Sequence, residues 1–164
     1  RYTGLRLGEI AQLDSSDIGR NEEGIYYLNI RRGVGQSVKT NSSLRHIPVP
    51  EHLIELGFLD YIAGIKGRLF PKVPKGSYDK VSIAMSRWWG NRVRAKGVET
   101  KQPSHAFRHT FKTEMRALGV QDSVSNSLSG HAAKSEGESY GSVTLKTKKD
   151  AIDKLPRLNI RKIY

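Results

Sequence analysis

Six side chains, spread over most of the chain, are of types that can act together on a phosphate ester. Arginine and lysine can hold phosphate oxygens, histidine can take up or release a proton near neutral pH, and a tyrosine hydroxyl can attack phosphorus. No cluster with the spacing of metal ligands accompanies them, and we expect neither a metal nor a cofactor. These types suit cleavage of a phosphodiester by a tyrosine. The six are Arg6, Lys39, His105, Arg108, His131 and Tyr140.

Chemistry alone suggests a role for each of them. Arg6 and Arg108 can each offer two parallel N–H donors to non-bridging phosphate oxygens, and these bonds strengthen as negative charge grows in the transition state. Tyr140 is the candidate nucleophile. Its hydroxyl has an ordinary pKa of about 10, so it needs a base or cationic surroundings. His105 is a candidate for that base.

Proton transfer explains the two remaining residues. His131 can donate a hydrogen bond to a phosphate oxygen, and Lys39 can protonate the departing 5′-oxygen. Each proton transfer can contribute about 10²- to 10⁴-fold in rate. Because the phosphate passes onto the tyrosine, the bond energy is kept and rejoining needs no ATP.

Four of the six are predicted to lie where helices begin, where free backbone N–H groups and the helix dipole favour an anion. Thr3 is a candidate N-cap for a helix over residues 4–13, which places Arg6 in the first turn. Ser104 precedes a helix predicted over 105–118.

The other side chains follow from the neighbouring elements. His105 and Arg108 are spaced i and i+3, so they share one side of their helix. His131 comes after Gly130, between helices predicted over 121–129 and 132–140. Lys39 is expected near the tip of a hairpin, and these positions would surround a single phosphate.

The remaining segments predict a mixed α+β fold, mostly helical with a small antiparallel sheet. Strands are expected over 25–31, 38–39 and 45–49, after a turn at 14–17. Short helices are expected over 51–57 and 144–155, and a last strand over 158–163. A longer helix over 79–95 has five apolar residues available for its buried side: Val81, Ile83, Met85, Trp88 and Trp89.

Composition points to one domain with a polyanionic partner. The chain has 164 residues, no cysteine, and 28 Lys and Arg against 16 Asp and Glu, for a net charge of +12. Such an excess favours nucleic acid, because neutralising phosphates releases counterions. There is no membrane-spanning stretch or signal peptide, which suits a cytoplasmic protein.

The local sequences around the six residues resemble the catalytic domain of the tyrosine recombinases, the phage integrase family. The resemblance covers about residues 2–141, in the family's order and with similar spacing. It is carried by Thr3-Gly4-Leu5-Arg6-Leu7-Gly8-Glu9-Ile10, Lys39-Thr40 with Arg45-His46-Ile47-Pro48, His105-Ala106-Phe107-Arg108-His109-Thr110-Phe111, Leu128-Ser129-Gly130-His131 and Tyr140.

The resemblance implies site-specific cleavage and rejoining of double-stranded DNA through a 3′-phosphotyrosyl link at Tyr140, for integration or excision of a mobile element. It also implies that Glu9 orients the site. Members act as homotetramers on DNA, and a monomer is one expectation without it. The family's usual Leu-Gly-His reads Ser129-Gly130-His131 here, a difference expected to affect packing more than chemistry.

The resemblance also implies an arrangement beyond the catalytic core. Members carry a separate DNA-clamping domain before the first arginine, so we expect residues 1–164 to be a single catalytic domain lacking its upstream part. Residues 144–164 match the family's C-terminal tail, which often docks on a neighbouring subunit. Four basic residues are candidate contacts to the DNA backbone: Arg87, Arg92, Arg94 and Lys134.

Other interpretations stay open at this point. A type IB topoisomerase shares the chemistry, and a basic DNA-binding module without catalysis needs no special role for Tyr140. His105 and His109 have the i, i+4 spacing of zinc ligands but no obvious third ligand. Gly33-Val34-Gly35 is not followed by the Gly-Lys-Ser/Thr of a phosphate-binding loop.

Overall fold

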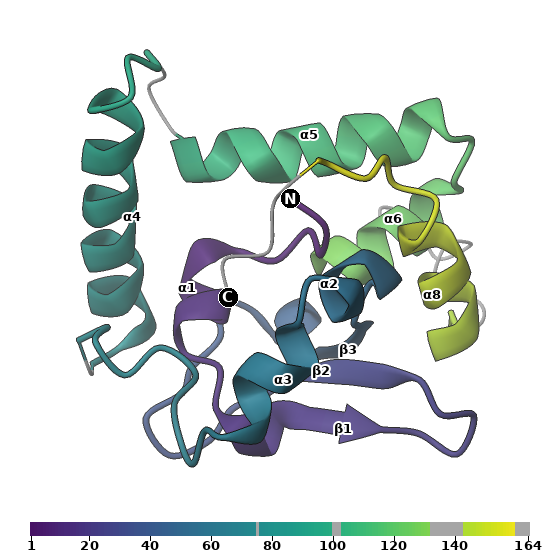
Figure 1. Cartoon of the computed structure of the whole chain (residues 1–164), viewed down its shortest axis with the longest axis horizontal. Helices are drawn as coiled ribbons and strands as arrows, with labels where there is room; N and C mark the ends of the chain where they lie inside the picture. Colours follow the sequence, from purple (N-terminus) through teal and green to yellow (C-terminus); the bar gives the residue numbers. More distant parts are fainter. Residues whose placement is uncertain (75, 100–102, 132–142, 160–164) are drawn as a thin grey trace.

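The computed structural model describes residues 1–74, 76–99, 103–131 and 143–159, and within them helices pack against a small antiparallel sheet (Figure 1). The strands β1 (Ile18–Arg20), β2 (Tyr26–Ile30) and β3 (Arg45–Pro48) lie in the order β1-β2-β3. Leu28 is opposite Ile47 in the β2–β3 pair, and alternate residues of β2 point inwards, as the two-residue period of a strand requires. This confirms the predicted α+β class.

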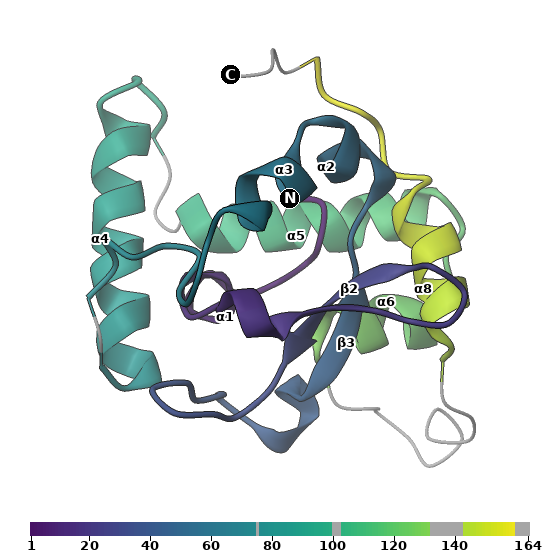
Figure 2. The ribbon, with the colours of Figure 1, turned by 60° about the horizontal axis from the view of Figure 1, so that its bottom comes forward.

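The helices are arranged on one side of the sheet and at one edge of the molecule. In Figure 1, α5 runs across the top, α4 stands apart at the left, and the strands lie at the bottom. Figure 2 shows α6 and α8 close to β3, in agreement with their contacts. The described α-helices are α1 (Leu7–Ala11), α2 (Glu51–Glu55), α3 (Phe58–Ala63), α4 (Tyr78–Arg94), α5 (Pro103–Ala117), α6 (Asp122–Ser129) and α8 (Leu145–Ile152).

The main core lies between the sheet and α5, α6 and α8. Phe111 and Met115, one turn apart on α5, are fully buried and belong to the same cluster as Ile47 of β3, Leu128 of α6 and Ile152 of α8. Burying side chains of this size contributes about 1.5–3 kcal/mol each. The core therefore fixes α5 and α6, the two helices that carry Arg108 and precede His131.

Two helix starts differ from the sequence prediction. α1 begins at Leu7, with Arg6 rather than Thr3 at its N-cap, and the backbone N–H of Arg6 donates to Glu9 Oε2 at 2.9 Å. An arginine side chain cannot accept a hydrogen bond, so this end is capped by Glu9. α5 begins at Pro103, a favoured first helical residue, and Ser104 lies inside the first turn.

The connection between β2 and β3 also corrects the prediction. The predicted strand over 38–39 is absent from it, and the chain turns back at a bridge between Gly33 and Gln36. Val34 and Gly35 therefore occupy the tip, and Lys39 lies on the returning arm. Strand β1 and helix α3 were not predicted.

The apolar side of the predicted helix over 79–95 is only partly buried. Val81 of α4 is buried, but Ile83 is 59% and Trp88 49% exposed. The predicted helix over 144–155 is confirmed in α8, and its C-terminal continuation packs on the same chain, where Arg157 Nη1 contacts Glu55 Oε2 at 2.7 Å. The predicted helix over 132–140 lies outside the described residues. Residues 158 and 159 form no strand, and 160–164 lie outside the described part.

Candidate active site

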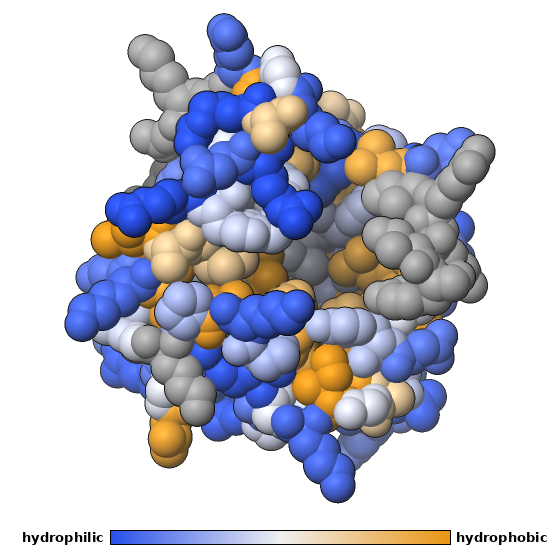
Figure 3. All heavy atoms as spheres, turned by 60° about the vertical axis from the view of Figure 1, so that its left-hand side comes forward, coloured by the Kyte–Doolittle hydropathy of each residue, from blue (hydrophilic) through white to orange (hydrophobic). Residues whose placement is uncertain are grey.

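Four of the six predicted residues line one open hollow of about 180 Å³ between α1, α4 and α5: Arg6, Lys39, His105 and Arg108. Tyr78 of α4 lines the same hollow. Two larger hollows flank α4, of about 750 and 700 Å³, but they are mostly apolar and contain none of the six. Figure 3 shows this side of the molecule, where hydrophobic side chains lie exposed among hydrophilic ones. Chemistry rather than size therefore identifies the site.

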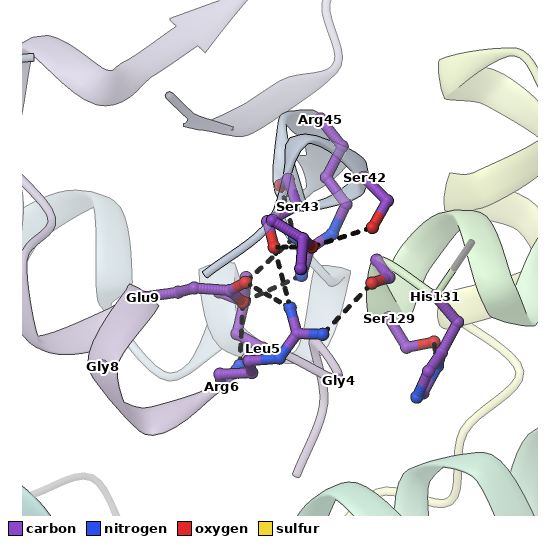
Figure 4. Close-up of polar contacts among 12 residues, drawn as sticks. Gly4, Leu5, Arg6, Gly8, Glu9, Ser42, Ser43, Arg45, Ser129 and His131 are labelled. Atoms are coloured by element: carbon purple, nitrogen blue, oxygen red, sulfur yellow. Dashed lines mark hydrogen bonds and ion pairs between the residues drawn. The ribbon is translucent and has the colours of Figure 1, made fainter. Parts of the chain in front are cut away.

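Arg6 is held in place by three elements (Figure 4). Its Nη1 donates to Glu9 Oε1 at 2.9 Å and to Ser43 Oγ at 3.0 Å, and its Nη2 donates to the carbonyl of Gly130 at 3.2 Å. The side chain keeps 21% of its surface exposed. Arg6 is thus rigidly placed but still open to a ligand.

Glu9 is the anion that orients Arg6, and it does so together with Arg45 of β3. Arg45 Nη2 donates to Glu9 Oε2 at 2.9 Å, and both side chains are almost fully buried. Burial would raise the pKa of the Glu9 carboxyl, but the hydrogen bonds and charge of Arg45, with the bonds from Arg6, keep it below its usual value. Glu9 is therefore ionised at neutral pH.

Arg45 belongs to the site although the sequence analysis assigned it no role. Its Nε donates to the carbonyl of Leu128 at 2.8 Å, which ties β3 to the end of α6. Gly130 ends α6 with a φ of 65°, and a Cβ there would lie 2.6 Å from Arg45 Nη1. Both the left-handed backbone and the closeness of Arg45 favour glycine before His131.

Arg108 of α5 is anchored to the segment that leads into Arg6. Its Nη1 donates to the carbonyl of Gly4 at 2.6 Å. Gly4 has a φ of 62°, and a Cβ there would lie 2.6 Å from Phe111, so this glycine also has a structural reason. Burial, followed by the charge of Arg6, lowers the pKa of Arg108 to about 10, which leaves it charged at neutral pH.

His131 does not line the hollow, but it contacts Arg108, which does. Its two ring nitrogens lie 3.4 and 3.3 Å from Arg108 Nη2. Lys112 of α5 donates to Asn126 Oδ1 at 3.0 Å and lies 3.4 Å from His131 Nδ1. Burial, then the charges of Arg108 and Lys112, lower the pKa of His131 to about 4, so the ring is neutral at pH 7.

Ser129 contacts one of the predicted site residues. Its hydroxyl oxygen lies 2.8 Å from His131 Nδ1, a contact that the expected effect on packing did not include. The contact between Ser129 and His131 spans two residues across a helix end, and no sequence pattern predicts it. Lys112, one turn beyond Arg108, is a second cation that the sequence analysis missed.

The remaining predicted residues divide into three groups. His105 and Lys39, the predicted base and acid, are exposed and line the hollow. Tyr140 and Lys134 lie outside the described residues. Arg87, Arg92 and Arg94 lie on exposed faces of α4, where the Arg92 guanidinium stacks 4.9 Å from the Trp88 ring centre.

The described residues contain neither a metal-binding cluster nor a membrane-spanning helix. No group of three or more His, Asp or Glu side chains placed to hold a metal ion occurs there, so His105 and His109 find no third ligand among them. No described helix has the length and apolarity to cross a membrane.

Comparison with known proteins agrees with the geometry. The phage integrase family matches residues 1–146. The chain is 29% identical to a tyrosine recombinase XerA of Pyrococcus furiosus over 93% of its length and 50% of the relative's. It is 26% identical to a tyrosine recombinase of Thermosipho africanus, covering 94% of this chain and 50% of the relative.

The chain thus spans about half the length of these curated relatives. No solved structure gives a significant match. The family match covers most of the chain, including the five site residues that the structure describes and also Tyr140. The chain belongs to the phage integrase family, the tyrosine recombinases.

Proposed function

We propose that the chain is the catalytic domain of a site-specific recombinase that cleaves and rejoins DNA through a phosphotyrosyl link at Tyr140. The observation that carries this proposal is that Arg6, at the start of α1, and Arg108, on α5, line one open hollow and are each held by hydrogen bonds. Two fixed guanidinium groups facing one space suit a phosphate with growing negative charge.

In the proposed cleavage step, the Tyr140 oxygen forms a bond to phosphorus and the bond from phosphorus to the 5′-oxygen breaks. His105 takes the tyrosine proton, and Lys39 gives a proton to the departing 5′-oxygen. Arg6, Arg108 and His131 stabilise the non-bridging oxygens. Glu9 acts through Arg6 by orienting its guanidinium.

We further propose the biological setting that the resemblance implied. The substrate is double-stranded DNA in the cytoplasm of a bacterial cell or a phage-infected host, and the reaction integrates or excises a mobile element as a homotetramer. The net charge of +12 and the exposed arginines of α4, Arg87, Arg92 and Arg94, support DNA as the partner. The proposal includes docking of the C-terminal tail, residues 144–164, on a neighbouring subunit.

Trapping of a covalent adduct tests the function and identifies the DNA site in the same experiment. The chain is incubated with a library of duplexes that each carry a randomised segment and a nick, so that the cleaved end diffuses away and rejoining fails. Adducts that survive detergent are recovered and sequenced. We expect enrichment of one sequence family with wild-type protein and no adduct with Tyr140→Phe.

Tyr26→Phe is the matched control, because it removes a hydroxyl from a tyrosine of β2 and keeps the ring that Arg20 stacks on at 5.1 Å. It should form adducts at the wild-type level. Non-covalent DNA binding that is unchanged in Tyr140→Phe, with no adduct from any variant, would instead support a binding module without catalysis.

A further inference from the structure

Ser129, the last residue of α6, is completely buried and makes two short contacts through one hydroxyl group. Its Oγ lies 2.8 Å from the backbone carbonyl of Ser125 and 2.8 Å from His131 Nδ1. A third contact, to the carbonyl of Asn126, is longer at 3.4 Å. The two short contacts have a consequence for where the protons are.

Counting hydrogens decides which atom donates. A hydroxyl group has one hydrogen, and a carbonyl oxygen has none. The contact with Ser125 is therefore a hydrogen bond only if Ser129 donates to it. The single hydroxyl hydrogen is then used, so the contact with His131 needs a hydrogen on Nδ1. If Ser129 donated to His131 instead, its Oγ and the carbonyl oxygen of Ser125 would lie 2.8 Å apart with no hydrogen between them.

The charge of the imidazole completes the assignment. Four cations face the ring: Arg108 and Lys112 from α5, Arg6 from the start of α1, and Arg45 from β3. With burial they keep the pKa of His131 near 4, so the ring carries one proton at neutral pH. If that proton is on Nδ1, Nε2 has a free electron pair. Arg108 Nη2, which can only donate, lies 3.3 Å from Nε2 and 3.4 Å from Nδ1, and Lys112 Nζ lies 3.4 Å from Nδ1. These longer contacts do not distinguish the two nitrogens, so the assignment rests on the 2.8 Å contact with Ser129.

We propose that Ser129 is a positioning residue that holds neutral His131 with its proton on Nδ1 and a free electron pair on Nε2. The consequence for catalysis rests on the proposed recombinase function. The neutral ring has no hydrogen on Nε2 and therefore cannot donate a hydrogen bond from Nε2 to a phosphate oxygen. His131 must first take one proton from water at Nε2, and the bound phosphate favours this by offsetting the surrounding positive charge. The imidazolium then donates through Nε2–H to the phosphate and through Nδ1–H to Ser129.

Nitrogen-15 NMR of the histidine rings tests the assignment on the full chain without DNA, because protonated and bare ring nitrogens have distinct shifts. The His131 signals are identified by their loss in His131→Gln. At pH 7 we expect Nδ1 protonated and Nε2 bare in the wild-type protein. A wild-type ring with its proton on Nε2 would overturn the proposal, whatever the serine variants show.

Two serine variants on the same helix separate the local contact from a general loss of a hydroxyl. In Ser129→Ala the proton should shift towards Nε2, the form that free histidine side chains favour in water. Ser127→Ala is the control, since the Ser127 hydroxyl donates to the carbonyl of Val124 at 2.7 Å and does not touch His131. It should leave the ring unchanged, and an equal shift in both variants would contradict the proposal.

Adduct formation gives a separate reading. Loss of one hydrogen bond that aligns the ring should slow cleavage by roughly 3- to 10-fold in Ser129→Ala, with no change in Ser127→Ala. If no variant or wild-type protein forms an adduct, the proposed function fails while the NMR result on His131 still stands or falls by itself. Cleavage by Ser129→Ala at the wild-type rate would remove Ser129 from the positioning role.

Discussion

Glu9 and Arg45 form an ion pair that is almost fully removed from water, with 0% and 5% of their side chains exposed and 2.9 Å between Oε2 and Nη2. Arg6 approaches the same carboxylate from the side of the hollow, at 2.9 Å from Oε1. The buried carboxylate of Glu9 therefore balances the charges of two arginines: the buried Arg45, and Arg6, which lines the hollow. This couples the stability of the fold to the geometry of the site.

Glu9→Gln should destabilise the protein by about 3 kcal/mol, because it leaves the buried charge of Arg45 without its counter-ion. Urea unfolding followed by circular dichroism measures the free energy. Glu55→Gln is the control, since Glu55 is 46% exposed and its pair with Arg157 lies at the surface. Its effect should stay within about 1 kcal/mol, and equal losses in the two variants would contradict the buried role of Glu9.

The same carboxylate should shape the acid sensitivity of the protein. Because the pKa of Glu9 is lower in the folded protein than its ordinary value of 4.5, its stabilising contribution is complete above pH 4.5. It is lost as the pH falls through the lower folded value. Stability of the wild-type protein should therefore drop more steeply below pH 4.5 than that of Glu9→Gln, and parallel curves would argue against this coupling.

Gly130→Ala should cost more than a left-handed backbone alone requires. Gly119 and Gly130 both end helices, with φ of 70° and 65°, but only at Gly130 would a Cβ meet another group, Arg45 Nη1 at 2.6 Å. Gly119→Ala should cost about 1–2 kcal/mol from the backbone, and Gly130→Ala clearly more. Thermal unfolding compares the two, and only Gly130→Ala should also slow adduct formation. Equal effects would mean that Arg45 moves aside without cost.

The pKa of His131, near 4, should depend on Lys112. As the pH falls below 6.5 the unfolded ring gains a proton and the folded ring does not, so His131 reduces stability between pH 6.5 and about 4. Lys112→Met removes one facing charge and should raise the midpoint in an NMR titration. Lys146→Met is the control, since that lysine pairs with Asp150 on α8, and its titration curve should match that of the wild type.

The helices and strands that carry the site were predictable where a segment has a sustained pattern of apolar residues or a clear capping or turn residue at its end. Strand β2 alternates in burial over its last three residues, and β3, α4, α5, α6 and α8 appear close to their expected ranges. Strand β1 is only three residues long and contains a glycine, so it has no pattern to recognise. Helix α3 follows α2 after only two residues, with Gly57 at a φ of 90°, and the two merge in sequence.

The residues that line the hollow could be predicted from their types and spacing, but the residues that hold them in place could not. Arg6, Lys39, His105 and Arg108 meet in one hollow as expected. Arg45 binds Glu9 across 36 positions, and Lys112 reaches His131 across 19, so neither contact leaves a local pattern. The contact of Ser129 with His131 was not predicted, because the hydroxyl points to His131 only once Gly130 turns the chain back.

Lys39 is expected to be the general acid, since it is exposed on the returning arm of the β2–β3 connection and lines the hollow with both arginines. Lys39→Ala should slow cleavage of the captured DNA by about 10²-fold or more, because the 5′-oxygen then leaves without a proton. A substrate with sulfur at the 5′-bridging position should restore the rate, since a thiolate is a good leaving group without protonation.

Lys66→Ala removes another exposed lysine that does not line the hollow, and it should cleave both substrates at wild-type rates. The rescue distinguishes proton donation from simple phosphate binding. A lysine that only holds a non-bridging oxygen would leave the variant slow on both substrates, because sulfur at the bridging position does not replace a lost cation. That outcome would move Lys39 from the acid role to the group of residues that bind phosphate.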